Sequence, residues 1–87
     1  MQRIIVVTAP DGLHARPAAQ LAQLAQHLPA RLRLSIGDRE VDATSVLAVM
    51  DLELTTGARV TLAAEGAGAE AALDAAEAIL APLPPPS

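Results

Sequence analysis

The spacing of hydrophobic and polar residues changes several times along this chain, and each change predicts a new element. In residues 3–8, Arg3 is followed by four apolar β-branched residues and a Thr. This run predicts a buried strand. The Pro and Gly within residues 9–12 end it, because Pro lacks an N–H donor and Gly permits a positive φ. Residues 31–36 and 59–64 alternate between apolar and polar side chains, so each predicts a strand with one solvent-facing side.

Three other segments place apolar residues at helical spacing. The first begins around Pro17, which suits the first turn of a helix, and Pro29 ends it near His27 or Leu28. A short helix follows Ser45, a favourable N-cap residue, and a last helix covers residues 69–81. The apolar faces expected of the first and last helices are Ala18, Leu21, Ala22, Ala25 and Leu28, and Ala69, Ala72, Leu73, Ala76 and Leu80.

The connections between these segments complete the predicted fold. Gly37-Asp38 is typical of a two-residue hairpin that leads into a return strand at residues 39–42. The order is then β-α-β-β-α-β-α, and we expect an α+β fold. It would be a two-layer open-faced sandwich with three helices on one face of a four-stranded antiparallel sheet. Residues 1–82 would form this domain, and residues 83–87 a Pro-rich tail that is either a simple terminus or the start of a linker.

Composition narrows the class of protein. Hydrophobic residues make up 52% of the 87 residues but none is aromatic, so the core must consist of Leu, Ile, Val and Ala. Without Cys there is no disulfide framework and no Cys-based zinc or redox site. No apolar run approaches the roughly 18 residues that span a bilayer, and the N-terminus lacks signal-peptide features. We expect a soluble cytoplasmic protein without direct membrane insertion.

Charge and histidine placement exclude further classes. The net charge of −4 and the lack of aromatic residues argue against a nucleic-acid partner, which requires basic and stacking side chains. His14 and His27 fall at opposite ends of one predicted helix, about 20 Å apart at the helical rise per residue. They cannot share a metal ion or form a catalytic pair within one chain. The sequence therefore predicts neither a metal site nor a cofactor.

His14 has a context that His27 lacks. It lies between Gly12 and a predicted helix start that contains Arg16 and Pro17. A helix start offers unpaired N–H groups and the positive end of the dipole, and Arg16 adds a planar charge suited to phosphate oxygens. An imidazole beside such an anion site could accept a phosphoryl group. By itself, the pattern also fits a solvated or capping histidine, the commoner role of a single loop histidine.

The motif around His14 resembles that of a known family. Gly12-Leu13-His14-Ala15-Arg16-Pro17-Ala18-Ala19 is similar to the active-site motif of HPr, the histidine-containing phosphocarrier of the phosphoenolpyruvate-dependent sugar phosphotransferase system. The segments Thr44-Ser45-Val46-Leu47 and Ala64-Glu65-Gly66, with Met50, Leu52 and Gly57, also fall where the family has them. The resemblance covers about residues 3–81, and the order of elements fits as well. Such a long match favours the phosphoryl acceptor over the solvated histidine.

The resemblance implies a mechanism. Enzyme I, phosphorylated by phosphoenolpyruvate, would pass its phosphoryl group to Nδ1 of His14, and phospho-His14 would pass it to a IIA domain or another acceptor. Arg16 would stabilise the phosphate, and Pro17, next to Ala15 and Arg16, would fix the backbone so that its N–H groups face the ring. Gly12 would allow the turn that exposes the ring. The protein would be a monomeric carrier rather than a stand-alone enzyme.

Ser45 has two expected roles. From the residues alone it is an N-cap, worth about 1 kcal/mol to the short helix. In some bacteria the family's equivalent serine is phosphorylated by a dedicated kinase, so Ser45 is also a candidate regulatory site. Thr44 precedes it, where kinase-regulated members often carry Lys.

The starts of the first two helices predict a partner-binding surface around His14. Its expected members are Ala15, Arg16, Ala19, Val46, Leu47 and Met50. A short helix cannot bury every side, so one or two of its apolar residues should be exposed, and we favour Leu47 and Met50.

Several residues depart from the family pattern. Asp11 stands where many members have Asn, and Gln23, Gln26 and Ala48 stand where Lys is frequent. Asp51 and Glu53 add acidity, so electrostatic steering toward an acidic partner should be weaker. His27 is expected only to interact favourably with the dipole at the end of its helix.

Other functions stay open beside the sugar-system carrier. The chain could be a regulatory or nitrogen-related phosphorelay carrier, or an HPr-like domain of a multidomain phosphotransferase. A non-catalytic regulatory binding module is the alternative from another class, although both His14 and Arg16 are present. An anion-binding domain for a free metabolite is weaker, because so small a chain offers no large apolar pocket.

Overall fold

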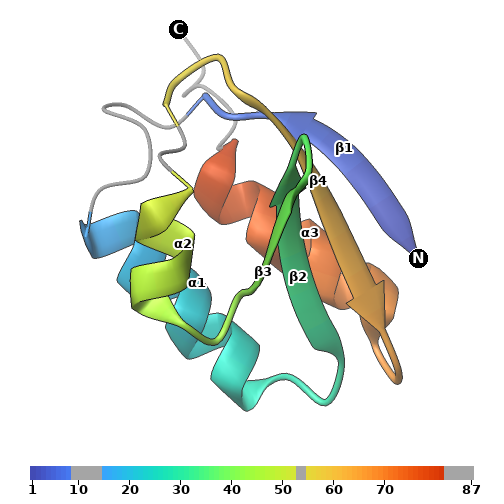
Figure 1. Cartoon of the computed structure of the whole chain (residues 1–87). Helices are drawn as coiled ribbons and strands as arrows, with labels where there is room; N and C mark the ends of the chain where they lie inside the picture. The colour runs from blue at the N-terminus through green and yellow to red at the C-terminus, as the bar shows by residue number, and fades with distance from the viewer. Residues whose placement is uncertain (9–14, 53–54, 82–87) are drawn as a thin grey trace, which may run out of the picture.

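The computed structural model describes residues 1–8, 15–52 and 55–81, and for residues 15–17 it describes the backbone alone. The strands are β1 (Gln2–Val6), β2 (Arg31–Ile36), β3 (Arg39–Asp42) and β4 (Arg59–Glu65), and the helices are α1 (Ala15–His27), α2 (Val46–Asp51) and α3 (Ala69–Leu80). All strand pairs are antiparallel, and the sheet order is β1-β4-β2-β3. The three helices lie on one side of this sheet (Figure 1). The predicted α+β sandwich is therefore confirmed.

The core lies between the sheet and the helices. Leu34 of β2 is opposite Leu62 of β4 at the centre of the sheet, and both are fully buried. The helices contribute mainly Ala and Leu. The buried residues of α1 and α3 are Ala18, Leu21, Ala22 and Ala25, and Ala72, Leu73, Ala76 and Leu80. These match the predicted apolar faces, except that Leu28 and Ala69 are only partly buried. Small Ala side chains allow α1 and α3, which contact each other, to pack closely.

The prediction for residues 3–8 is wrong in two respects. β1 runs from Gln2 to Val6. Val7 still exchanges backbone hydrogen bonds with Gly57 and Ala58, but Thr8 leaves the sheet and donates its backbone N–H to the carbonyl of Leu80 at the end of α3, 3.0 Å away. The strand is also not buried on both faces. Ile5 is buried, but Ile4 and Val6 are 66% and 44% exposed. Helices cover only one face of the sheet, so alternate residues of β1 face solvent.

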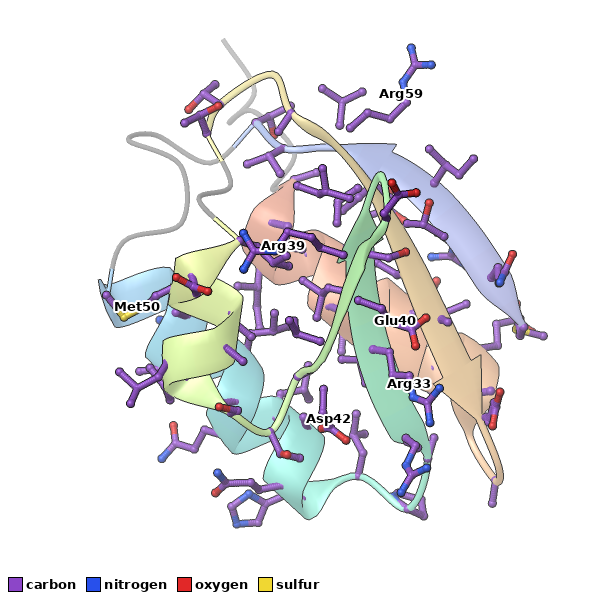
Figure 2. All side chains as sticks on the ribbon, in the orientation of Figure 1. Arg33, Arg39, Glu40, Asp42, Met50 and Arg59 are labelled. Carbon is purple, nitrogen blue, oxygen red and sulfur yellow. The ribbon has the colours of Figure 1, made fainter. Side chains whose placement is uncertain are left out.

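Turns join these elements where the sequence predicts them. The β2–β3 hairpin turns at Gly37 and Asp38, and Gly37 has a φ of +57°, which a side chain would disfavour. Gly68 has a φ of +76° and is the N-cap residue of α3. On the solvent-facing side, Arg33 of β2 pairs with Glu40 of β3 at 3.2 Å (Figure 2). No helix among the described residues is long and apolar enough to span a membrane.

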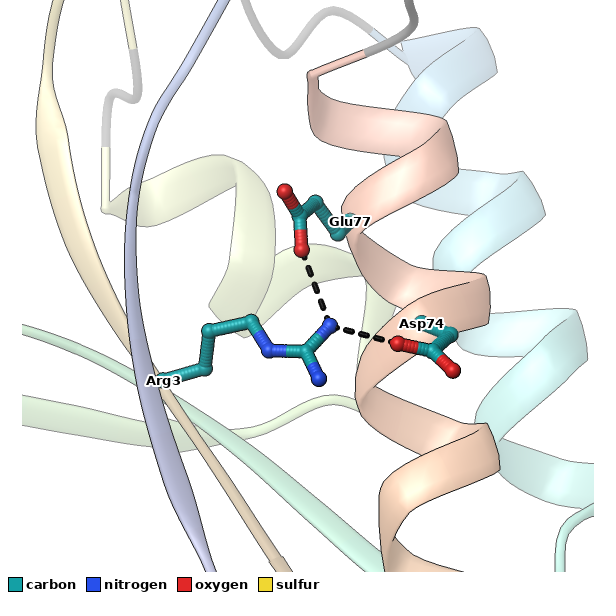
Figure 3. Close-up of polar contacts among 3 residues, drawn as sticks. All are labelled: Arg3, Asp74 and Glu77. Carbon is teal, nitrogen blue, oxygen red and sulfur yellow. Dashed lines mark hydrogen bonds and ion pairs between the residues drawn. The ribbon is translucent and has the colours of Figure 1, made fainter.

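One ion-pair cluster joins the edge strand to the last helix. The Nη1 of Arg3 donates to Asp74 Oδ1 at 2.7 Å and to Glu77 Oε1 at 2.9 Å (Figure 3). Asp74 and Glu77 are three residues apart on α3, so both carboxylates project toward β1 from one side of the helix. These hydrogen bonds raise the pKa of the Arg3 guanidinium, and the bond to Asp74 contributes more than the bond to Glu77.

Candidate functional site

The backbone around the predicted phosphoryl acceptor is described from Ala15 onward. His14 and Gly12 lie outside the described residues, as do the side chains of Ala15, Arg16 and Pro17. α1 begins at Ala15, directly after His14 in the sequence, and its first turn contains no acidic residue. The first N–H groups of a helix lack intrahelical partners, and the dipole is positive there. The helix start thus supplies an electrostatic setting suited to an anion beside residue 14.

The expectation that the starts of α1 and α2 lie together is wrong. The two helices contact each other, but Gln26 Nε2, in the last turn of α1, donates to the carbonyl of Thr44, just before α2, at 3.2 Å. The start of α2 therefore lies beside the end of α1, and the two helices run in roughly opposite directions (Figure 1). It is the end of α2, with Met50, that extends toward the beginning of α1 (Figure 2).

α2 presents an apolar surface to solvent. Leu47 is 79% exposed and Met50 37% exposed, whereas Val49, on the opposite side, is fully buried. Val46 is half-buried, and Ala19 of α1 is exposed. The prediction that Leu47 and Met50 are exposed is confirmed. We call these two residues the α2 apolar surface.

Side chains fix the start of α2. The Oγ of Ser45 accepts the backbone N–H of Ala48 at 3.2 Å, so the predicted N-cap is confirmed. One residue earlier, Thr44 donates its backbone N–H and its hydroxyl to Asp42 Oδ1, at 2.9 and 2.7 Å. These two hydrogen bonds stabilise the charged carboxylate and lower the pKa of Asp42, with smaller contributions from the charges of Arg31 and Arg33.

A contact at the other end of α2 escapes sequence reasoning. Arg39 of β3 donates through Nη2 to Asp51 Oδ2 at 2.6 Å and through Nη1 to the carbonyl of Asp51 at 3.1 Å. The sequence indicated Asp51 only as added acidity, but the structure places a guanidinium against it. No periodic pattern links residues of different elements, so no sequence signal was available for this pair.

His27 occupies the last turn of α1. Its Nδ1 lies 2.7 Å from the carbonyl of Gln23, so an Nδ1–H can donate to this helix-end oxygen. The predicted position of His27 at the end of the helix is confirmed, and its favourable interaction with the dipole stays a prediction. The ring is engaged with its own helix, and we assign it no chemistry.

Comparisons with known proteins match nearly the whole chain to one family. A family model described as "PTS HPr component phosphorylation site" matches residues 1–81. Over 82 residues the chain is 45% identical to the phosphocarrier protein HPr of Haloferax volcanii, with 92% of each chain covered. It is also 39% identical over 75 residues to the phosphocarrier protein NPr of Shewanella violacea, covering 86% of this chain and 82% of that protein. Among solved structures, the phosphocarrier protein HPr of Bacillus anthracis str. Ames superposes with a TM-score of 0.87 at 35% identity, covering 92% of this chain and 95% of the other.

Proposed function

Because this chain belongs to the HPr family of phosphocarrier proteins, we propose that it carries a phosphoryl group on His14 from one protein to another. The observation that carries the proposal is the family match over residues 1–81, together with the His14-Ala15-Arg16-Pro17 motif directly at the start of α1. The donor is phospho-Enzyme I, charged by phosphoenolpyruvate, and the acceptor is a IIA component of the sugar phosphotransferase system. Residues 1–82 are the carrier domain, which acts in the cytoplasm as a monomer.

The transfer consists of two displacements at phosphorus. The lone pair of His14 Nδ1 attacks the phosphorus of phospho-Enzyme I, the new N–P bond forms, and the bond to the donor breaks. The acceptor then attacks the phosphorus of phospho-His14, and the imidazole leaves. Arg16 and the N–H groups at the start of α1 stabilise the charge of the phosphoryl oxygens. Gly12, Ala15 and Pro17 support this arrangement.

Docking brings each partner onto the surface beside this histidine. The α2 apolar surface supports this part of the proposal, since Leu47 is 79% exposed on a helix that contacts α1. Large apolar side chains that project into solvent are typical anchors of protein interfaces. Ala15, Ala19 and Val46 complete the binding surface. Ser45, whose hydroxyl is exposed at the start of α2, is a candidate site for a regulatory serine kinase.

Intact mass tests the carrier function directly. We would incubate the protein with phosphoenolpyruvate and a cognate Enzyme I, beside His14→Ala and the matched control His27→Ala. We expect one added phosphate on the native protein and on His27→Ala, none on His14→Ala, and loss of the phosphate in acid. An acid-stable phosphate would indicate a hydroxyl acceptor instead. No addition with the cognate donor would overturn the proposal and favour a non-catalytic binding module.

Leu47→Ala tests the docking surface. We expect the KM for transfer from Enzyme I to rise about tenfold, since an exposed apolar anchor contributes roughly 1.4 kcal/mol or more to an interface. The free energy of unfolding should change by less than about 0.5 kcal/mol, because the side chain packs little in the free protein. Ile4→Ala is the matched control, since Ile4 is 66% exposed on the far face of the sheet. Equal KM values for both variants would exclude Leu47 from the interface.

A second candidate is a regulatory phosphorelay carrier with the same chemistry. The 39% identity to a phosphocarrier protein NPr favours it beside the sugar-system role. The two differ in their partners, so transfer rates to a panel of IIA domains distinguish them. Rapid transfer to a sugar-specific IIA supports the first candidate, and transfer confined to a regulatory IIA supports the second.

A further inference from the structure

Helix α2 is too short to be stable by itself. It has six residues, Val46–Asp51, whereas isolated helices below about 12 residues are marginal in water. Its orientation therefore depends on contacts from other elements. On the core side Val49 is fully buried, and at the start Ser45 caps the first turn. A third contact, at the end of the helix, comes from outside both α1 and α2.

That contact is made by Arg39. Its guanidinium reaches from β3 to the last residue of α2 (Figure 2), where it donates to both the carboxylate and the carbonyl of Asp51. The last carbonyl groups of a helix lack intrahelical partners, and a cation at the negative end of the dipole is favourable. Two hydrogen bonds from one planar group also restrict direction, which a single point charge cannot do.

The position of Arg39 bears on the α2 apolar surface. Met50 immediately precedes Asp51, and Leu47 lies one helical turn before it. A shift of the end of α2 would move both side chains relative to α1, where the proposed transfer takes place. Arg39 also offsets the negative charge of Asp51, which would otherwise stand next to the docking residues.

We infer that Arg39 is a positioning residue for partner docking, which holds the end of α2 through Asp51 so that Leu47 and Met50 face the incoming protein. This inference rests on the proposed phosphocarrier function. Arg39 is not one of the residues proposed to bind the phosphoryl group. It acts on the KM of the transfer, through the helix, and leaves kcat unchanged.

The test compares Arg39→Gln with the matched control Arg59→Gln. Arg59 is also an exposed strand arginine, at the start of β4, and its side chain points away from α2 (Figure 2). Both variants remove one positive charge, but only the first removes the contacts with Asp51. For transfer from Enzyme I, we expect Arg39→Gln to raise KM about three- to tenfold with kcat within about twofold. Arg39→Lys, which keeps the charge without the planar fork, should recover part of the difference.

Amide hydrogen exchange of α2 supplies a readout independent of phosphoryl transfer. The N–H groups of Val49 and Leu52 donate to carbonyls within this segment, those of Ser45 and Val49. They should exchange faster in Arg39→Gln and in Asp51→Asn, while the amides of β4 stay unchanged. The Arg59→Gln protein should match the native protein at both places.

The outcomes separate this inference from the proposed function. Equal KM values for Arg39→Gln and Arg59→Gln would overturn it. A raised KM with unchanged α2 exchange would also overturn it, since Arg39 would then touch the partner directly. If the native protein accepts no phosphoryl group, the carrier function is overturned, and so is a role of Arg39 in docking for phosphoryl transfer. The exchange of the α2 amides then decides by itself whether Arg39 holds the helix.

Discussion

Asp42 illustrates how single residues tune the stability of this chain. Its carboxylate accepts two hydrogen bonds from Thr44, and these lower its pKa below that of the unfolded chain. The charged form is therefore favoured by folding. The stability that it contributes is present above the unfolded pKa, about 3.9, and is lost as the pH falls through the lower native pKa.

Asp42→Asn should remove this pH-dependent contribution. At pH 7 we expect the free energy of unfolding to fall by a few tenths to about 1 kcal/mol, a small value because the carboxylate is exposed to solvent. At about pH 3 the difference between the native and variant proteins should be smaller, because the carboxyl of the unfolded chain is then largely protonated. Urea titrations at both pH values measure the difference. Asp38→Asn, in the hairpin turn, is the control, and an equal loss in that variant would contradict the role of the Thr44 contacts.

The exposure of Leu47 and Val49 could be predicted only in part from the residues. The pattern after Ser45 predicted a short helix with some apolar residues outside, and the choice of Leu47 and Met50 is confirmed. The placement of these residues against α1 could not be predicted. It involves contacts between the two helices, including the hydrogen bond from Gln26 to the carbonyl of Thr44, and no periodicity relates these residues.

At the scale of elements, α2 depends on its caps. Ser45→Ala removes the oxygen that accepts the N–H of Ala48, and we expect a loss of about 1 kcal/mol in the free energy of unfolding. Ser45→Asp should retain most of the stability, because Asp is also a good N-cap residue. Urea unfolding midpoints measure both changes.

Ser35→Ala gives the matched control for the cap. Ser35 lies on β2 and is half-buried, so its removal tests the loss of a hydroxyl without the loss of a cap. Equal destabilisation by Ser35→Ala and Ser45→Ala would show that the cap contributes nothing specific. Ser45→Asp adds a negative charge but keeps the N-cap, so a change in partner docking in this variant would come from the charge and not from unfolding of α2.

At the scale of the whole molecule, Arg3 connects the first strand to the last helix. In the sheet formed by the described residues, β1 is the edge strand next to β4, and Arg3 of β1 forms ion pairs with Asp74 and Glu77 of α3 (Figure 3). We expect Arg3→Gln to lower the Tm at low ionic strength. The difference should shrink in about 1 M salt, where the screening length falls to about 3 Å.

Arg59→Gln serves again as the charge-matched control for this prediction. It also removes one positive charge, but among the described residues Arg59 forms no ion pair that this change would break. Thermal unfolding of the native protein and both variants at two salt concentrations makes the comparison. A Tm difference for Arg3→Gln that does not respond to salt would indicate lost side-chain packing instead.

The sequence by itself determined the identity of the elements and, for β2, β4 and the helices, which of their faces are buried. Alternation in residues 31–36 and 59–64, helical spacing after Pro17, and the cap at Ser45 are local signals, because neighbours at two, three or four residues share a face. The motif around His14 likewise stands within one short segment, and its resemblance to the family requires no information from the fold.

Only the tertiary structure decided how these elements are assembled. In the folded protein β4 lies between β1 and β2, Ile4 and Val6 are exposed, and α2 runs in roughly the opposite direction to α1. It also brought Arg39 to Asp51. Each of these depends on contacts between segments far apart in the chain, whose geometry follows from the packing of the whole core. No local periodicity encodes such contacts, since they form only when the sheet and its helices close around the same interior.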